Sequence, residues 1–234
     1  MSDERRALTR AVKQHVEGLR AFGLSAVPSA PVRHEAPEVV AEQSVDSSAS
    51  ERLERLAREV ATCQRCPLYR TATQGVVSDG TPTARLMFVG EAPGRDEDLQ
   101  GKPFVGRAGQ LLTKMIEAMG MKREQVYICN VLKHRPPENR VPLPEEMDAC
   151  LPYLQEQIAV VKPKVICTLG AVATKALLGP HVSITKIRGE IHEYQGTRLV
   201  PTFHPAYLLR NPPAKKFAWE DLKKVKRLLA TSDT

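Results

Sequence analysis

The sequence has no long apolar segment. Nowhere in its 234 residues is there an uninterrupted run of about 18 apolar residues, the length that a membrane-spanning helix requires. The first ten residues, MSDERRALTR, also lack the apolar core of a secretion signal. We therefore expect a soluble, cytoplasmic protein.

Cysteine is scarce, with five in the whole chain. An odd number of thiols cannot all be paired, and a reducing cytosol disfavours disulfides. These two facts argue against a disulfide framework. The remaining question is whether the cysteines bind a metal ion or a metal cluster.

Acidic residues are outnumbered, and the formal net charge is +7. The excess is not uniform, because residues 185–227 hold ten basic and only four acidic side chains. Such a concentration near the C-terminus is typical of a surface that follows a phosphate backbone. For residues 219–229 taken alone, a solvent-exposed helix with a charged outer face explains the pattern equally well.

Three segments of different composition follow one another along the chain. Apolar residues at helical spacing predict an amphipathic helix within residues 1–24, a candidate contact for an unknown protein partner. Residues 25–50 are rich in Pro, Ala, Ser and Glu without a sustained period, which favours a flexible linker. We expect the globular domain to span residues 51–234, to begin with a helix over 51–61, and to act as a monomer.

Strand and helix patterns alternate within this domain. Short, nearly continuous apolar segments predict buried strands at residues 85–90, 126–132, 164–170 and 198–204. Helical patterns lie between them at residues 109–119, 144–161 and 171–178. This order favours an α/β fold, a three-layer α/β/α sandwich around a parallel sheet.

Residues with distinct chemistry follow the predicted strands. Gly90 permits close backbone approach, Asn130 offers a paired donor and acceptor, and His204 can stabilise negative charge. Phe104, in the Gly-rich segment after the first strand, offers a stacking face. Each has an ordinary alternative, namely a structural turn, a turn asparagine, a strand-end histidine or a core phenylalanine. Because ligands gather at the carboxyl edge of such sheets, their convergence predicts a pocket for a flat, polar ring.

Four motifs together resemble the uracil-DNA glycosylase superfamily, specifically its family 4, the iron–sulfur branch. They are GEAPGRDED at 90–98, PFVGRAGQLL at 103–112, NVLKHRPPENRVP at 130–142 and HPAYLLR at 204–210. The resemblance covers residues 55–229. It implies a four-stranded parallel sheet between helices and removal of uracil from DNA by base flipping, which leaves an abasic site in the single- or double-stranded substrate.

The resemblance assigns roles within the pocket. Phe104 would stack on the extruded base, Asn130 would match the Watson–Crick edge of uracil, and His204 would donate to uracil O2 during cleavage. The backbone at Gly90 and Ala92 would line the same site.

A carboxylate would orient the attacking water or stabilise the cationic sugar. Glu91 and Glu97 are both candidates. More active members of the family carry aspartate at the position of Glu91, so the choice between the two stays open. A solvated turn or helix start is the alternative interpretation of the acidic residues 96–98.

The residues after His204 resemble the family's DNA-entering loop. Tyr207, Leu208, Leu209 and Arg210 combine an apolar wedge with a cation, which suits insertion into the minor groove. Initiation of a helix is the simpler interpretation, and the two are compatible.

Four positions match the spacing of the family's ligands to a 4Fe-4S cluster, namely Cys63, Cys66, His134 and Cys150. Histidine stands where cysteine is usual, and we prefer His134 as the fourth ligand because histidine also ligates iron in Rieske centres. Cys129 is a competitor, although as a strand residue it is expected in the core, as is Cys167. A three-cysteine cluster with an open iron, or zinc in place of the cluster, remains an alternative.

Two other functions share these features. A related branch captures uracil-DNA covalently through a histidine on an inserted loop, but here His134 is followed directly by Arg135 and Pro136, so turnover is favoured over capture. The alternatives are therefore a covalent or non-catalytic uracil-DNA binding protein and an inactive, zinc-bearing nucleic-acid module.

Overall fold

A computed structural model describes residues 40–231 and the side chains of residues 48–231. The helix expected within residues 1–24 and most of the expected linker lie outside the described residues. Within them, α2 spans Val40–Ala61, so the assignment of residues 40–50 to the linker is wrong. This stretch contains neither Pro nor Gly, and its Ala, Glu and Gln residues are good helix formers. The helix expected from residue 51 therefore begins eleven residues earlier.

The described residues form a six-stranded sheet in the order β1-β3-β2-β4-β6-β5. The strands are β1 (Ser78–Gly80), β2 (Leu86–Gly90), β3 (Tyr127–Asn130), β4 (Val165–Leu169), β5 (His192–Tyr194) and β6 (Thr197–Thr202). The four central strands are parallel, and they are the four that the sequence predicts. The short edge strands β1 and β5 pair antiparallel and were not predicted.

Helices lie between the strands and follow the last of them, β6. They are α3 (Arg95–Gln100), α4 (Arg107–Ala118), α5 (Pro144–Val161), α6 (Ala171–Leu178), α7 (Ile184–Ile187), α8 (Pro205–Arg210) and α9 (Lys215–Ala230), with 3-10 turns η1 (Pro67–Arg70), η2 (Arg123–Gln125), η3 (Pro137–Asn139) and η4 (Pro212–Ala214). The bounds of α5 and α6 are those expected from the sequence, and α4 begins two residues earlier than expected. None of the described helices is both long and apolar enough to cross a membrane.

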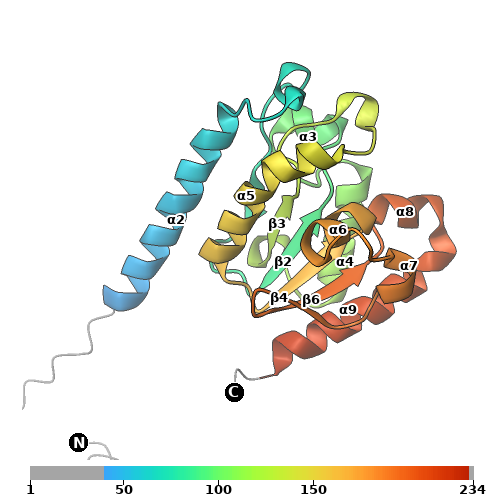
Figure 1. Cartoon of the computed structure of the whole chain (residues 1–234). Coiled ribbons are helices and arrows are strands. Elements are labelled where there is room, and N and C mark those ends of the chain that lie inside the picture. The colour runs from blue at the N-terminus through green and yellow to red at the C-terminus, as the bar shows by residue number, and fades with distance from the viewer. Residues whose placement is uncertain (1–39, 232–234) are drawn as a thin grey trace, which may run out of the picture. The chain divides into compact units, whose positions relative to one another are not determined.

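The sheet is covered on both faces, which gives three layers (Figure 1). Successive residues of β2 point to opposite sides, so Met87 and Val89 pack with α5 and α6, while Leu86 and Phe88 pack with α4 and α9. All four are fully buried, and each contributes about 1.5–3 kcal/mol of hydrophobic stabilisation. Two-sided burial explains why the strands are continuously apolar rather than alternating.

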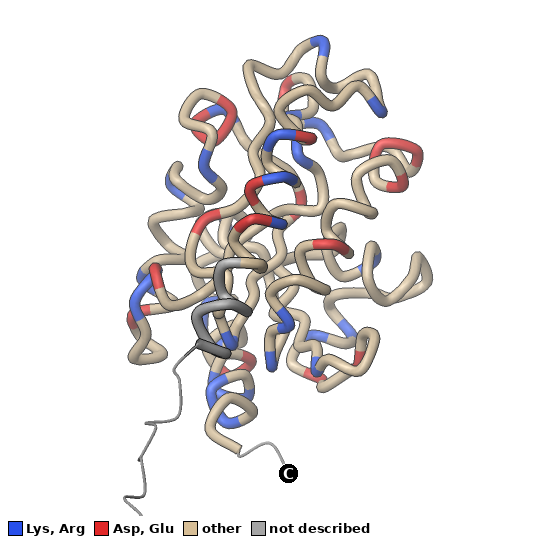
Figure 2. The backbone as a smooth tube through the Cα atoms, turned by 90° about the vertical axis from the view of Figure 1, so that its left-hand side faces the viewer, with Lys and Arg blue, Asp and Glu red and all other residues tan. Residues whose placement is uncertain are grey.

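Helix α2 lies against α5 and carries alternating basic and acidic positions along its described side chains (Figure 2). Arg52 pairs with Glu156 of α5 at 2.8 Å. Arg55 and Glu59 form a pair within α2 at 3.9 Å. Such exposed pairs contribute little individually, so the packing of Leu56 and Val60 against Tyr153 holds the helix in place.

Candidate active site

A cavity of about 400 Å³ opens at the carboxyl edge of the parallel sheet. Its lining brings together the residues that the sequence places after separate strands, namely Glu91, Ala92, Phe104, Asn130 and His204. Glu97 and Arg210 also border it. Because parallel strands end at the same edge, residues distant in sequence converge there. The volume is adequate for one flat heterocyclic ring.

Gly90 ends β2 and, unlike Ala92, is not among the residues that line the cavity. A Cβ atom at this position would lie 2.3 Å from Asn130 Oδ1 and 2.5 Å from Phe104 Cζ. Both distances are far below van der Waals contact. The absence of a side chain at Gly90 is therefore what allows the amide and the ring to approach one another.

The Phe104 ring is held by an unusual backbone conformation. Its φ is +55°, in the left-handed region, and the side chain is only 6 % exposed. The Glu97 carboxylate accepts hydrogen bonds from the backbone N–H groups of Gly94, Val105 and Gly106, each at 3.0 Å. Glu97 thus fixes the segment that carries Phe104.

Asn130 presents an unpaired acceptor to this space. The side chain is buried, and its Oδ1 has no hydrogen-bond partner among the described residues. Its backbone carbonyl accepts from Lys133 Nζ at 2.6 Å, which fixes the end of β3. An unsatisfied buried acceptor costs about 1–3 kcal/mol, so a ligand that donates to Oδ1 would recover this energy.

His204 precedes α8 and is neutral at physiological pH. Its Nδ1 accepts from the backbone N–H of Ala206 at 3.1 Å, so the neutral ring carries its proton on Nε2. Burial, together with the nearby charge of Arg210, lowers the pKa of His204 to about 4. The ring centroid lies 5.6 Å from that of Phe104. His204 is thus a hydrogen-bond donor that stays uncharged.

The two candidate carboxylates differ in their surroundings. Burial raises the pKa of Glu91, and its carboxylate makes no hydrogen bond or ion pair with another described residue. The oxygens of Glu97 are occupied by three backbone donors. The geometry therefore favours Glu91 as the carboxylate that meets a water molecule or a sugar.

The loop expected to enter DNA is only partly exposed. Tyr207 is 37 % exposed and Arg210 is also exposed, but Leu208 is buried against Ala214 and Ala218. The prediction of Leu208 as part of the wedge is therefore wrong, because the helical turn of α8 directs this position inward. Leu209, half-buried, is the leucine that remains accessible.

Sequence reasoning missed one wall of the cavity. It is lined by Pro136, Asn139 and Arg140. These residues lie in the motif at 130–142, which carries the family resemblance but did not indicate that they border the cavity. Arg140 donates to both carboxylate oxygens of the buried Glu146, at 2.8 and 2.6 Å. This bidentate pair braces the wall against the start of α5.

Three thiols converge beside this wall. Cys63 is close enough to raise the pKa of both Cys66 and Cys150, and Cys66 also raises the pKa of Cys150. Burial, the larger cause, raises the pKa of Cys150 to about 11. All five cysteines are free, and Cys129 is buried in its strand, as expected.

The expected fourth ligand is less clearly placed. His134 is buried, which lowers its pKa, and the charge that acts on it comes from Asp98 rather than from the thiols. The backbone of the preceding residue, Lys133, donates to the Cys150 thiol, so the two segments are adjacent. Among residues 48–231, no group of three His, Cys, Asp or Glu side chains has the arrangement of a metal site.

Comparison with known proteins finds a family model and several close relatives. The model, described as the uracil DNA glycosylase superfamily, matches residues 77–223. A type-4 uracil-DNA glycosylase of Sulfurisphaera tokodaii is 47 % identical over 188 residues, covering 76 % of this chain and 86 % of the relative. The enzymes of the same name from Thermotoga maritima and Archaeoglobus fulgidus are 47 % and 41 % identical, each over 76 % of this chain, and 95 % and 94 % of their own lengths are covered.

Proposed function

The chain belongs to the uracil DNA glycosylase superfamily, and from this we propose that it hydrolyses the N-glycosidic bond of uracil in DNA. The products are free uracil and an abasic site, so the protein acts in base-excision repair. The observation that carries the proposal is the unpaired Asn130 Oδ1 inside a cavity that Phe104 and His204 also line.

Recognition of uracil follows from the polarity of the Asn130 amide. The uracil nucleotide leaves the stack and enters the cavity, where its ring stacks on Phe104. Asn130 Oδ1 accepts from uracil N3–H, and the amide NH₂ group donates to O4. Cytosine has an acceptor at N3 and a donor at C4, so both contacts would be repulsive. Discrimination arises because buried polar groups would then be left unpaired.

Cleavage places negative charge on uracil and positive charge on the sugar, and the site has a residue that acts on each. The electron pair of the C1′–N1 bond stays with uracil, while the sugar becomes cationic. His204 Nε2–H donates to uracil O2 and stabilises the anion. A water molecule adds to C1′, and the Glu91 carboxylate accepts its proton. Uracil then leaves and is protonated by solvent.

Contact with the DNA backbone involves the exposed part of α8. Tyr207 and Leu209 provide apolar surface for the vacated stack, and Arg210 lies at the cavity and provides a cation for a phosphate. We propose that the protein acts as a cytoplasmic monomer on single- or double-stranded DNA.

We also propose that Cys63, Cys66 and Cys150 hold a 4Fe-4S cluster, with His134 as the fourth ligand. What supports the proposal is the chemistry of the donors: Cys63, Cys66 and Cys150 are free thiols close enough to affect one another's pKa, and the backbone next to His134 reaches Cys150. Zinc is the alternative. Such a cluster would serve as a structural cross-link, since hydrolysis needs no electron transfer. Iron and sulfide analysis with the visible spectrum tests this, because a cluster is brown and zinc is colourless.

The activity is tested on oligonucleotides that contain one deoxyuridine, with the thymidine oligonucleotide of the same sequence as the control. We expect free uracil and alkali-labile sites from the first substrate alone. A complex that persists on a denaturing gel without release of uracil would instead indicate covalent capture. Absence of both would refute the proposed function.

A further inference from the structure

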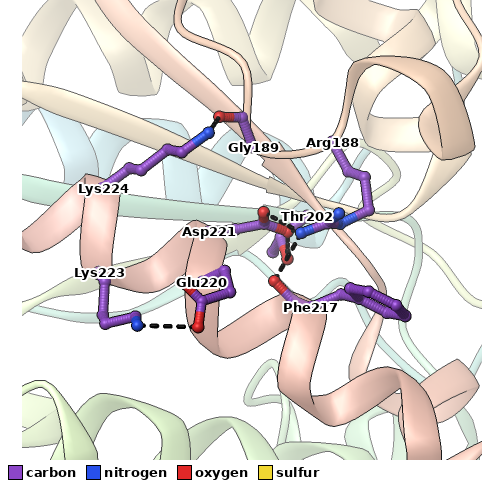
Figure 3. Close-up of polar contacts among 8 residues, drawn as sticks. All are labelled: Arg188, Gly189, Thr202, Phe217, Glu220, Asp221, Lys223 and Lys224. Atoms are coloured by element: carbon purple, nitrogen blue, oxygen red, sulfur yellow. Dashed lines mark hydrogen bonds and ion pairs between the residues drawn. The ribbon is translucent and has the colours of Figure 1, made fainter.

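A buried polar network lies where β6 ends (Figure 3). At its centre is Asp221 of α9, which is 1 % exposed. Its carboxylate accepts from the guanidinium of Arg188, through Nε at 3.0 Å and through a terminal nitrogen, and from Thr202 Oγ1 at 2.8 Å. Asp221 thus joins α9, the segment after α7 and the last residue of β6.

The segment after α7 is shaped to permit this contact. Gly189 has a φ of +71°, and a Cβ at this position would lie 2.2 Å from Asp221 Oδ1. Its N–H donates to the carbonyl of Pro201 in β6 at 2.8 Å, and its carbonyl accepts from Lys224 Nζ at 2.6 Å. Only glycine satisfies both the conformation and the space.

The network reaches the active site through one residue. Phe203 separates Thr202 from His204, and the Arg188 guanidinium lies 5.5 Å from the Phe203 ring and 5.2 Å from the ring of Phe217. The Phe203 ring in turn lies 4.9 Å from that of Tyr207. Arg188 therefore contacts Phe203, the residue before His204, directly, and reaches Thr202 through Asp221.

Stability alone does not explain this arrangement. The pKa of Asp221 is raised on balance by burial, and the hydrogen bonds from Thr202 and Arg188 offset only part of this cost of desolvation. Apolar residues of similar volume often stabilise a core as well as a buried ion pair does, but they do not fix the orientation of the segments that they join. The bidentate Arg188–Asp221 pair, together with the hydrogen bond from the Thr202 hydroxyl, does fix this orientation. It does so at Thr202, two residues before His204.

We propose that Arg188 and Asp221 are positioning residues for base release, holding the Thr202–Phe203 backbone so that His204 Nε2 faces the cavity. This inference rests on the proposed function. Neither residue borders the cavity, so both act through His204.

The test is a comparison of Asp221→Asn with Glu220→Gln. Both exchange a carboxylate for an amide on α9, but Glu220 is exposed and, among the described residues, pairs with Lys223 alone, at 2.8 Å (Figure 3). We expect Asp221→Asn to slow single-turnover uracil release by about 10- to 100-fold, since small misplacements of catalytic groups have effects of this size. Glu220→Gln should release uracil at the wild-type rate. Fluorescence of Trp219, the single tryptophan of the chain, verifies that α9 is folded in each variant.

A double-mutant cycle distinguishes positioning from general support of the fold. In a His204→Ala background, Asp221→Asn should have no further effect on release, because the group through which it acts is gone. Equal, additive losses in both backgrounds would overturn the inference. Should Asp221→Asn fail to fold, Arg188→Lys keeps the charge but loses the bidentate contact, and a wild-type rate in that variant would overturn it equally.

A second readout does not depend on activity. In ¹⁵N-histidine spectra, with His204 assigned from the His204→Ala variant, the wild type should show a single neutral tautomer with the proton on Nε2. Asp221→Asn should show a mixture of tautomers, and an unchanged spectrum would contradict the inference. If the wild-type protein released no uracil while this spectral change occurred, the proposed function would fail and the positioning role would stand.

Discussion

At the scale of single residues, the neutral state of His204 determines what it contributes. With a pKa of about 4, the ring is uncharged over the physiological range and donates a hydrogen bond rather than a proton. This contact strengthens as negative charge develops on the departing uracil, so it favours the transition state over the bound substrate.

We therefore predict that His204→Ala lowers the single-turnover rate of uracil release by about 10²- to 10³-fold, the usual effect of removing one such donor. Binding of uracil-DNA should weaken far less. Fluorescence anisotropy with a labelled oligonucleotide measures the binding, and base release measures the rate. Equal losses in both would contradict the role assigned to His204.

The pH dependence should report Glu91. Burial places its pKa above the ordinary value of 4.5, and only the carboxylate can accept a proton from water. As the pH falls through this raised pKa, the rate should fall, whereas His204 becomes charged only near its own pKa of about 4. Rates measured from neutral pH downward should show this acid limb in the wild type and not in Glu91→Gln, which should be slow throughout.

Stability provides the control for this prediction. A carboxyl group with a raised folded-state pKa contributes stability below its unfolded pKa and loses it as the pH rises through the folded pKa. At neutral pH the ionised Glu91 therefore destabilises the fold, and Glu91→Gln should melt at the wild-type temperature or above. A lower melting temperature would mean that loss of activity in this variant reflects unfolding.

At the scale of elements, α3 and the segment after it act as one support for Phe104. The left-handed backbone of Phe104 is unfavourable by itself, and three backbone hydrogen bonds to Glu97 compensate for it. In Glu97→Gln, the NH₂ group would face a backbone N–H, so at least one bond is lost. We predict a fall in kcat/KM of about tenfold, because each charge-assisted bond contributes about 1.5–3 kcal/mol.

The matched control for this variant is Glu117→Gln, an exposed position on α4. It should have wild-type kinetics and a wild-type melting temperature. If Glu97→Gln matched it in kcat/KM, Glu97 would have no part in holding the Phe104 segment.

Elements also show what the sequence could predict of the fold. The central strands and α5 were predictable because two-sided burial and helical periodicity leave strong patterns over many residues. Strands β1 and β5 have three residues each and none of these residues is fully buried, so local composition carries too little signal. The start of α2 was missed because a Ser-rich segment without a clear period resembles a linker, although nothing in it breaks a helix.

The same reasoning explains which residues of the site could be predicted from the sequence and which could not. Asn130 and His204 follow strands, and topology brings such positions together whatever the connecting segments do. Arg140 reaches the cavity from a turn with two left-handed residues, which no periodicity reveals. Leu208 was misplaced because the sequence motif says which residues form the loop and not which face of α8 points outward.

At the scale of the whole molecule, the three thiols lie where separate segments meet. Cys63 follows α2, Cys66 precedes η1, and Cys150 lies in α5. A cluster at this point would connect the N-terminal helix of the described domain to the layer that supports Arg140 and the cavity wall. Its contribution would therefore be to the stability of the fold, because ligand binding that requires the folded chain adds to the free energy of unfolding.

We predict that Cys150→Ser abolishes the bound iron and lowers the melting temperature by more than about 4 °C, the shift that 1–2 kcal/mol produces in a domain of this size. Cys129→Ala is the matched control, since this buried thiol of β3 is the competing ligand. It should also melt at a lower temperature, because the substitution leaves a cavity, yet keep its iron and its visible absorption.

His134→Cys should retain iron, whereas His134→Ala should lose part of it. If Cys129→Ala lost its iron while Cys150→Ser kept it, Cys129 and not Cys150 would be the ligand. Both variants should melt at a lower temperature, but only the loss of a ligand should lower the iron content as well.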